Sequence, residues 1–208
     1  MYYEASEGHG LAYDPFKAII APRPIGWIST LASDGTPNLA PYSFFNALAS
    51  TTPILMFSSE TLKDSATNAR DTGEFAFSLA TTALQNEMNI SSDTVDASEN
   101  EYSNAGLAMA ACKKISTPRV ANSPASMECV TLSVEQLKNK DKQVIDVFMV
   151  IGQVVGIHIN DAFIKDGRFD TAAASPLARC GYRDYASVDS VFELMRPSDI
   201  NGYDGTDR

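Results

Sequence analysis

The 208-residue chain contains little histidine and little cysteine, and this scarcity limits the chemistry that it can carry. Its histidines are His9 and His158, and its cysteines, Cys112, Cys129 and Cys180, lie far apart with no Cys-X-X-Cys pair. A zinc or iron centre would need mostly carboxylate ligands, so we predict no metal site. A Ser-His-Asp hydrolase would need His158 as its base, and the sequence offers no partner for it. An odd number of scattered cysteines is typical of a reduced intracellular protein, and we expect a cytoplasmic one.

Positive charge is also scarce. Sixteen Lys and Arg residues face 26 Asp and Glu residues, which gives a net charge of −10. Such a chain repels nucleic-acid phosphates and anionic lipid, so we expect neither nucleic acid nor membrane as a partner. The longest apolar run, near residues 148–159, is too short for a membrane span. A phosphate site here would have to be a local pocket of backbone N–H groups and one or two cations.

Several common motifs are missing from the sequence. It contains no GxGxxG, no GxxxxGK[ST] and no GxSxG. A Rossmann phosphate site, a P-loop and the nucleophile elbow of α/β-hydrolases are therefore excluded.

Alternating apolar residues and turn signals predict a mainly β protein with a single domain over residues 1–208 and a core of about 15–197. We expect an Asp34-Gly35 hairpin turn, and a bulge or barrel corner at Gly152 and Gly156. Residues 91–106 are polar and acidic and are interpreted as a surface excursion. Six or seven mostly antiparallel strands with short helices fit a closed barrel best. Strands are predicted over 25–31, 38–50, 54–58, 75–79, 130–134 and 143–159, and helices over 64–72 and 82–88, with a further short one from Asp14.

The segment from Ser58 to Ser65 looks suited to an anion. A strand ends in Ser58 and Ser59, and a helix begins after Lys63. The first turn of a helix has unpaired N–H groups and a partial positive charge, which together bind anions. The alternative is an ordinary capped helix, with Asp64 or Thr61 as N-cap and Lys63 in solvent.

A polar-aromatic run precedes this segment. Phe44 and Phe45 are adjacent in a predicted strand, so they face opposite sides, and one can enter the core while the other lines a pocket. Ser43 and Asn46 offer hydrogen-bonding groups to a planar ring. The alternative is two core phenylalanines, with Asn46 capping a turn.

Several segments are distinctive when they are taken together and in order. They are Arg-Pro-Ile-Gly-Trp-Ile-Ser-Thr (23–30), Asn-Leu-Ala-Pro-Tyr-Ser-Phe-Phe-Asn (38–46), Lys-Asp-Ser-Ala-Thr-Asn (63–68), Thr-Gly-Glu-Phe (72–75), Met-Glu-Cys (127–129), 151–159, 166–170 and 192–197. Over about residues 15–197, the chain resembles the flavin reductase-like family of FMN-binding split β-barrel proteins. The resemblance implies a homodimeric split β-barrel, mostly antiparallel with short peripheral helices, that binds FMN near the subunit interface.

The resemblance also implies cofactor-binding residues. Those along the isoalloxazine ring and ribityl chain would be Ser43, Phe44, Phe45 and Asn46. Those around the phosphate would be Ser58, Ser59, Lys63, Asp64, Ser65 and Asn68. Ser65 stands where the family often has Thr, and it keeps the hydroxyl. Thr67 stands where many members carry a larger or basic residue, which puts the strength of phosphate binding in doubt.

A flavin performs its own hydride and electron chemistry, so no catalytic acid–base pair is predicted. The resemblance implies NAD(P)H as the donor that reduces FMN, and His158, Arg183 and Tyr185 are candidates for binding that substrate. Each has a structural alternative: a strand-end histidine, a surface arginine and a packed tyrosine. The alternative function is a flavoredoxin-like electron carrier without nicotinamide turnover. An electron-transfer or monooxygenase partner is expected, and an acidic surface suits docking to a basic protein.

Overall fold

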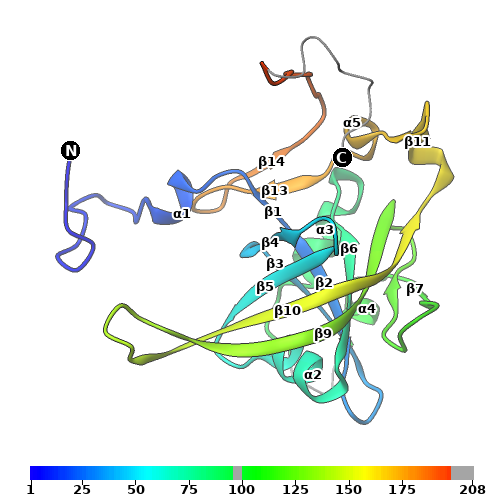
Figure 1. Cartoon of the computed structure of the whole chain (residues 1–208), viewed down its shortest axis with the longest axis horizontal. Helices are drawn as coiled ribbons and strands as arrows, with labels where there is room; N and C mark the ends of the chain where they lie inside the picture. The colour runs from blue at the N-terminus through cyan, green and yellow to red at the C-terminus, as the bar shows by residue number, and fades with distance from the viewer. Residues whose placement is uncertain (96–99, 198–208) are drawn as a thin grey trace.

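The computed structural model describes residues 1–95 and 100–197, and strands dominate it (Figure 1). Seven antiparallel strands form one curled sheet in the order β3-β2-β6-β9-β10-β5-β4. Its members are β2 (Gly26–Leu31), β3 (Pro37–Tyr42), β4 (Phe45–Ala49), β5 (Ile54–Glu60), β6 (Glu74–Leu79), β9 (Ala125–Lys138) and β10 (Val144–Ile159).

Smaller sheets and short helices surround this one. A three-stranded sheet joins β1 (Arg23–Pro24), β13 (Leu177–Arg179) and β14 (Tyr185–Ser187), and two-stranded sheets join β7 (Met109–Ala110) to β8 (Arg119–Val120) and β11 (Ile164–Lys165) to β12 (Arg168–Phe169). The helices are α1 (Phe16–Ile19), α2 (Asp64–Thr72), η1 (Thr82–Leu84), α3 (Gln85–Ile90), α4 (Glu101–Asn104), η2 (Asp161–Phe163) and α5 (Thr171–Ala174). Among the described residues, no helix is long and apolar enough to cross a bilayer.

The barrel is split rather than closed. The edge strands β3 and β4 pair only with β2 and β5 in the part of the chain that the structure describes. The sequence predicted one strand over 38–50, but the chain bends at Ser43 and Phe44 and divides it into β3 and β4. This bend lets the chain leave one edge of the sheet and return at the other.

The predicted irregularity at Gly152 and Gly156 is confirmed. The β9–β10 ladder shifts register between Ile151 and Gly152 and again between Val154 and Gly156. A Cβ at Gly152 would lie 2.3 Å from Cε1 of Phe75, so only glycine lets the strand pass over this buried ring. Both irregularities bend β10 where it crosses the core.

Two apolar clusters lie on opposite faces of β2, because successive side chains of a strand alternate. Ile28 belongs to the cluster inside the curled sheet, together with Phe57 and Phe75, and α2 adds Ala66 and Ala69 to it. Trp27 is fully buried and belongs to the second cluster, whose members are Ile25, Trp27, Leu39, Ala80, Met88, Tyr102, Val120 and Leu177.

The second cluster corrects one prediction. Residues 91–106 were expected to be a surface excursion, yet Ser91, Glu101 and Tyr102 are buried. Residues 96–99 of this segment lie outside the described residues. Tyr102 is only 1% exposed because α4 packs it beside Trp27. This polar and acidic stretch therefore contributes a core residue.

Candidate functional site

The helix α2 presents its N-terminus without a side-chain cap. The N-cap position is Lys63, and within the described residues no side chain makes a capping hydrogen bond there. The alternative interpretation, in which Asp64 or Thr61 is the N-cap, is therefore wrong. The helix ends after Thr72, as the predicted range 64–72 has it, and Gly73 follows in the left-handed conformation (φ 75°). Its first-turn N–H groups keep their partial positive charge, and Lys63 adds a full charge beside them.

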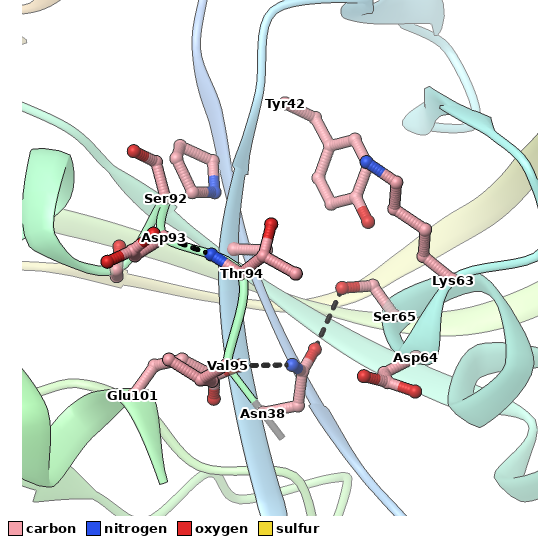
Figure 2. A pocket seen from close by; sticks show the side chains of 13 residues that line it. Asn38, Tyr42, Lys63, Asp64, Ser65, Ser92, Asp93, Thr94, Val95 and Glu101 are labelled. Atoms are coloured by element: carbon pink, nitrogen blue, oxygen red, sulfur yellow. Dashed lines mark hydrogen bonds between the residues drawn. The ribbon is translucent and has the colours of Figure 1, made fainter. Parts of the chain in front are cut away.

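A cavity of about 280 Å³ opens at this helix end. Figure 2 shows residues 92–95 and Glu101 on one side of it, and Tyr42 with the start of α2 on the other. Burial raises the pKa of Tyr42, and the neighbouring hydroxyls of Ser65 and Ser59 partly offset that effect. The lining residues are Asn38, Ala40, Pro41, Tyr42, Lys63, Asp64, Ser65, Ser91, Ser92, Asp93, Thr94, Val95 and Glu101.

Two of the predicted phosphate ligands turn toward the sheet instead of the cavity mouth. The Ser65 hydroxyl donates to Oδ1 of Asn38 at 2.8 Å, and Nδ2 of Asn68 donates to Oγ1 of Thr30 at 3.2 Å. Both contacts fasten α2 to β2 and β3. Backbone N–H groups and Lys63 are thus better placed for an anion than these side chains.

The cavity is not uniformly positive. Asp64, Asp93 and Glu101 line it, and Lys63 is its only basic residue among the described ones. Burial raises the pKa of Glu101, although the Leu39 N–H and the Asn38 amide donate to its carboxylate. An anion would therefore be held at the α2 end of the cavity and repelled from the Glu101 end.

The two adjacent phenylalanines separate as predicted. Phe45 stacks on Phe77 of the core, with ring centroids 4.9 Å apart and an interplanar angle of 10°. Phe44 lies at the bend, where Nζ of Lys17 and Cζ of Arg23 stand 5.6 and 5.9 Å from its ring centroid. The Phe44 side of the bend is therefore an aromatic surface with cations over it.

This bend adjoins the end of β5. The carbonyl of Phe44 accepts a hydrogen bond from the Ser58 N–H at 2.8 Å. Ser59 is buried, and within the described residues its Oγ has no hydrogen-bond partner. Asn46 is exposed, and its Oδ1 accepts from the Ala47 N–H. The aromatic run and the hydroxyl run predicted from the sequence are thus neighbours.

Arg23 and the tail residues lie beside the N-terminal segment. Arg23 is 6% exposed and donates to the carbonyls of Lys17, Ile20 and Cys180. Strand β13 pairs with β1 on one side and β14 on the other. The guanidinium carbon of Arg179 lies 4.4 Å above the ring of Tyr185, and Arg183 is exposed.

His158 lies away from the cavity at the N-terminus of α2. It lines a second, polar cavity of about 380 Å³ together with Lys113, Arg119 and Asn160. Its Nε2 lies 2.5 Å from Oε1 of Glu128, the partner that the sequence did not reveal. Glu128 is the middle residue of the Met-Glu-Cys segment, and its place in that segment was the only sequence feature that singled it out.

The ten residues assigned to FMN stay a prediction, as do His158, Arg183 and Tyr185. The first cavity includes Lys63, Asp64 and Ser65, and neither cavity includes Phe44, Ser58 or Arg183. Asn38, Thr30 and Glu101 were not among the predicted site residues, although their hydrogen bonds join α2, β2, β3 and α4.

Comparison with known proteins decides the family. Residues 20–173 match the model of the Flavin reductase like domain. The chain belongs to the flavin reductase-like family. It is 31% identical over 182 residues to an uncharacterized protein of Aquifex aeolicus (strain VF5), covering 85% of this chain and 89% of that one.

Solved structures of this family's fold agree with the description above. Nitrilotriacetate monooxygenase component B from Bacillus cereus has a TM-score of 0.86 and 26% identity, covering 93% of this chain and 98% of that one. A split-barrel protein from Shewanella frigidimarina NCIMB 400 has a TM-score of 0.81 and 19% identity, covering 94% and 99%. The predicted split β-barrel of a flavin reductase-like flavoprotein is thereby confirmed.

Proposed function

We propose that this protein binds FMN and that NAD(P)H reduces the bound flavin by hydride transfer. The uncapped N-terminus of α2 beside Lys63 is the observation that carries the proposal. In a chain of net charge −10, such a local site is what an anionic cofactor requires. Membership of the flavin reductase-like family supports a flavin as the ligand.

Different residues would bind the phosphate and the ring of FMN. Lys63 and the first N–H groups of α2 would bind the phosphate, and Ser58 and Ser59 would supply hydroxyl donors next to it. Phe44, with Lys17 and Arg23 over its ring, would lie against the flavin. FMN supplies the hydride and electron chemistry, so the protein contributes position, polarity and access.

We also infer a homodimer. Val130, Leu132, Val155 and Ile157 are 42, 52, 37 and 56% exposed on neighbouring strands β9 and β10. Exposed apolar side chains gathered on one sheet are typical of a protein interface. A second protein partner, of the monooxygenase class, is supported by the likeness to nitrilotriacetate monooxygenase component B.

Lys63→Ala is expected to weaken FMN binding by about 1–3 kcal/mol, because it removes one charge-assisted contact. This corresponds to a roughly 5- to 150-fold rise in the dissociation constant. Quenching of FMN fluorescence during titration measures it. Lys140→Ala, at the exposed β9–β10 turn, removes the same charge and should bind FMN like the unaltered protein. If both variants bind FMN with equal affinity, Lys63 does not bind the phosphate and the phosphate site lies elsewhere.

Anaerobic titration of the FMN-loaded protein with NADH and NADPH tests the reaction. We expect at least one of them to bleach the flavin absorption, because hydride transfer needs only direct access to the ring. A flavin that neither nucleotide reduces, but that a reduced protein donor bleaches, would establish the electron carrier instead.

A further inference from the structure

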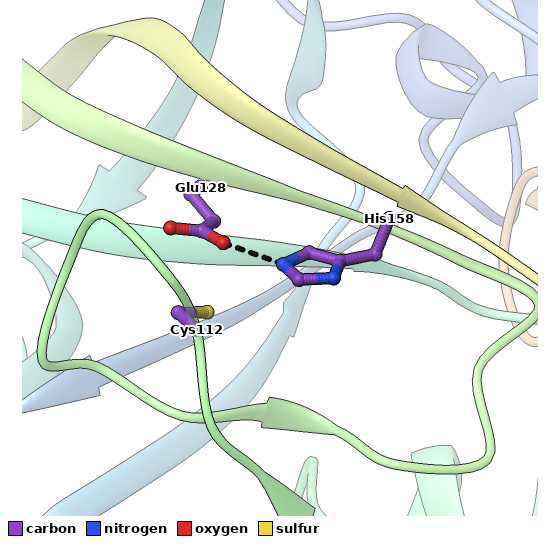
Figure 3. Close-up of side chains that lie close together, drawn as sticks. All are labelled: Cys112, Glu128 and His158. Atoms are coloured by element: carbon purple, nitrogen blue, oxygen red, sulfur yellow. Dashed lines mark hydrogen bonds and ion pairs between the residues drawn. The ribbon is translucent and has the colours of Figure 1, made fainter.

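Cys112, Glu128 and His158 form a cluster outside the proposed FMN site. One ligand atom from each, the thiol sulfur, a carboxylate oxygen and an imidazole nitrogen, all lie within 4.8 Å of one another (Figure 3). We propose that these three side chains bind a late first-row divalent metal ion such as Zn²⁺. The proposal does not depend on flavin binding.

Three separate segments bring the donors together. Glu128 lies on β9 and His158 on β10, where Glu128 pairs with Gly156 and Ser126 pairs with His158. Side chains on diagonal positions of neighbouring strands share a face of the sheet, so Glu128 and His158 meet. Cys112 comes from the connection between β7 and β8, which passes over this face (Figure 3).

Hydrogen bonds hold the connection in place over the sheet. The Glu128 carboxylate accepts from the N–H groups of Lys113 and Lys114 at 2.8 and 2.6 Å. Glu74 accepts from the N–H groups of Ser116 and Thr117 at 2.8 and 2.7 Å. Cys112 is therefore fixed beside His158 before any ion arrives, which lowers the entropic cost of assembling a site.

The backbone also leaves room for the carboxylate. A Cβ at Gly156 would lie 3.0 Å from Cδ and 3.2 Å from Oε1 of Glu128. A larger residue at this position would crowd the Glu128 side chain, which would have to shift by a few tenths of an ångström. The bulge at Val154 and Gly156 thus serves the cluster as well as the curvature of the strand.

The donor set matches the ion. Thiolate, imidazole and carboxylate are the ligands that Zn²⁺ and its neighbours prefer, and two anionic donors balance its charge. Bonds of about 2.0–2.3 Å place tetrahedral ligand atoms about 3.5 Å apart, so small side-chain movements suffice. His158 also lines the 380 Å³ polar cavity, so a water molecule there is the natural fourth ligand.

Cobalt provides a direct test, because a thiolate bound to Co²⁺ gives charge-transfer absorption in the near ultraviolet. The full chain, stripped with EDTA and kept reduced, is titrated with Co²⁺ and then with Zn²⁺. We expect a saturable band that Zn²⁺ abolishes, and its loss in Cys112→Ser. Cys180→Ser, which removes a thiol from another part of the fold, should keep the band and the affinity.

His158→Gln provides a second variant in case Cys112→Ser fails to fold, as judged by circular dichroism. It should weaken Co²⁺ binding at least about 10-fold. The proposal is overturned if the unaltered protein gives no saturable band. It is equally overturned if the band persists in Cys112→Ser, or if His158→Gln binds Co²⁺ unchanged.

Discussion

Glu128→Ala is expected to lower the free energy of unfolding by about 2–4 kcal/mol, measured by urea denaturation in the presence of EDTA. The side chain is 1% exposed and accepts from two backbone N–H groups and His158. Its removal leaves part-buried donors without this acceptor and opens a void, and both effects are costly. Glu135→Ala, at an exposed position of the same strand, should change stability by less than about 0.5 kcal/mol. A loss no larger than that in Glu128→Ala would contradict the account.

The stabilisation by Glu128 should depend on pH. Burial acts to raise the pKa of Glu128, but the N–H groups of Lys113 and Lys114 and the His158 ring outweigh it, so the pKa lies below its usual value near 4.5. A carboxyl group with a lowered pKa stabilises the folded state above its unfolded pKa, and this contribution is lost as pH falls through the folded pKa. The stability difference between the unaltered protein and Glu128→Ala should therefore shrink below about pH 4.5.

Trp27→Ala is expected to cost about 3–5 kcal/mol, the range for removing a large buried aromatic side chain. The ring is fully buried in the second cluster, and its Nε1 donates to Oγ of Ser91 at 2.9 Å. Ser91 is the first residue of the segment 91–95, which lines the first cavity. Loss of the Trp27 hydrogen bond should therefore also make this segment less firmly held.

Two matched variants separate the effects of Trp27. Trp27→Phe keeps most of the apolar volume but loses the donor to Ser91. Ser91→Ala keeps the ring and loses its acceptor, together with the hydrogen bond that the Ser91 hydroxyl donates to the Met88 carbonyl. Each should cost less than Trp27→Ala in thermal or urea unfolding. If Trp27→Ala costs under about 1 kcal/mol, the ring does not anchor the second cluster.

Local patterns predicted the elements that local forces determine. The alternation of apolar residues predicted the strand that the structure shows as β6, and the predicted helix over 64–72 matches α2. Because Phe44 and Phe45 are adjacent, they were predicted to face opposite sides, and Phe45 stacks in the core. The bend at Ser43 is different, because the pairing of β4 with β5 and of β3 with β2 decides it, and such contacts leave no periodicity in the sequence.

The site was predictable in outline only. The run from Ser58 to Ser65 indicated an anion site at α2, and the structure places an uncapped helix end there. The same run did not indicate that the Ser65 hydroxyl donates to Asn38, because these two residues come together only in the folded chain. His158 and Cys112 are 46 positions apart in the sequence, and only the β9–β10 ladder and the connection above it bring them together.

Retention of FMN tests the central claim most directly. The protein is incubated with FMN, passed through a gel-filtration column, and examined by absorbance before and after denaturation. We expect a yellow protein fraction that releases FMN when it unfolds. A colourless protein fraction, with FMN fluorescence unquenched when the two are mixed, would contradict it.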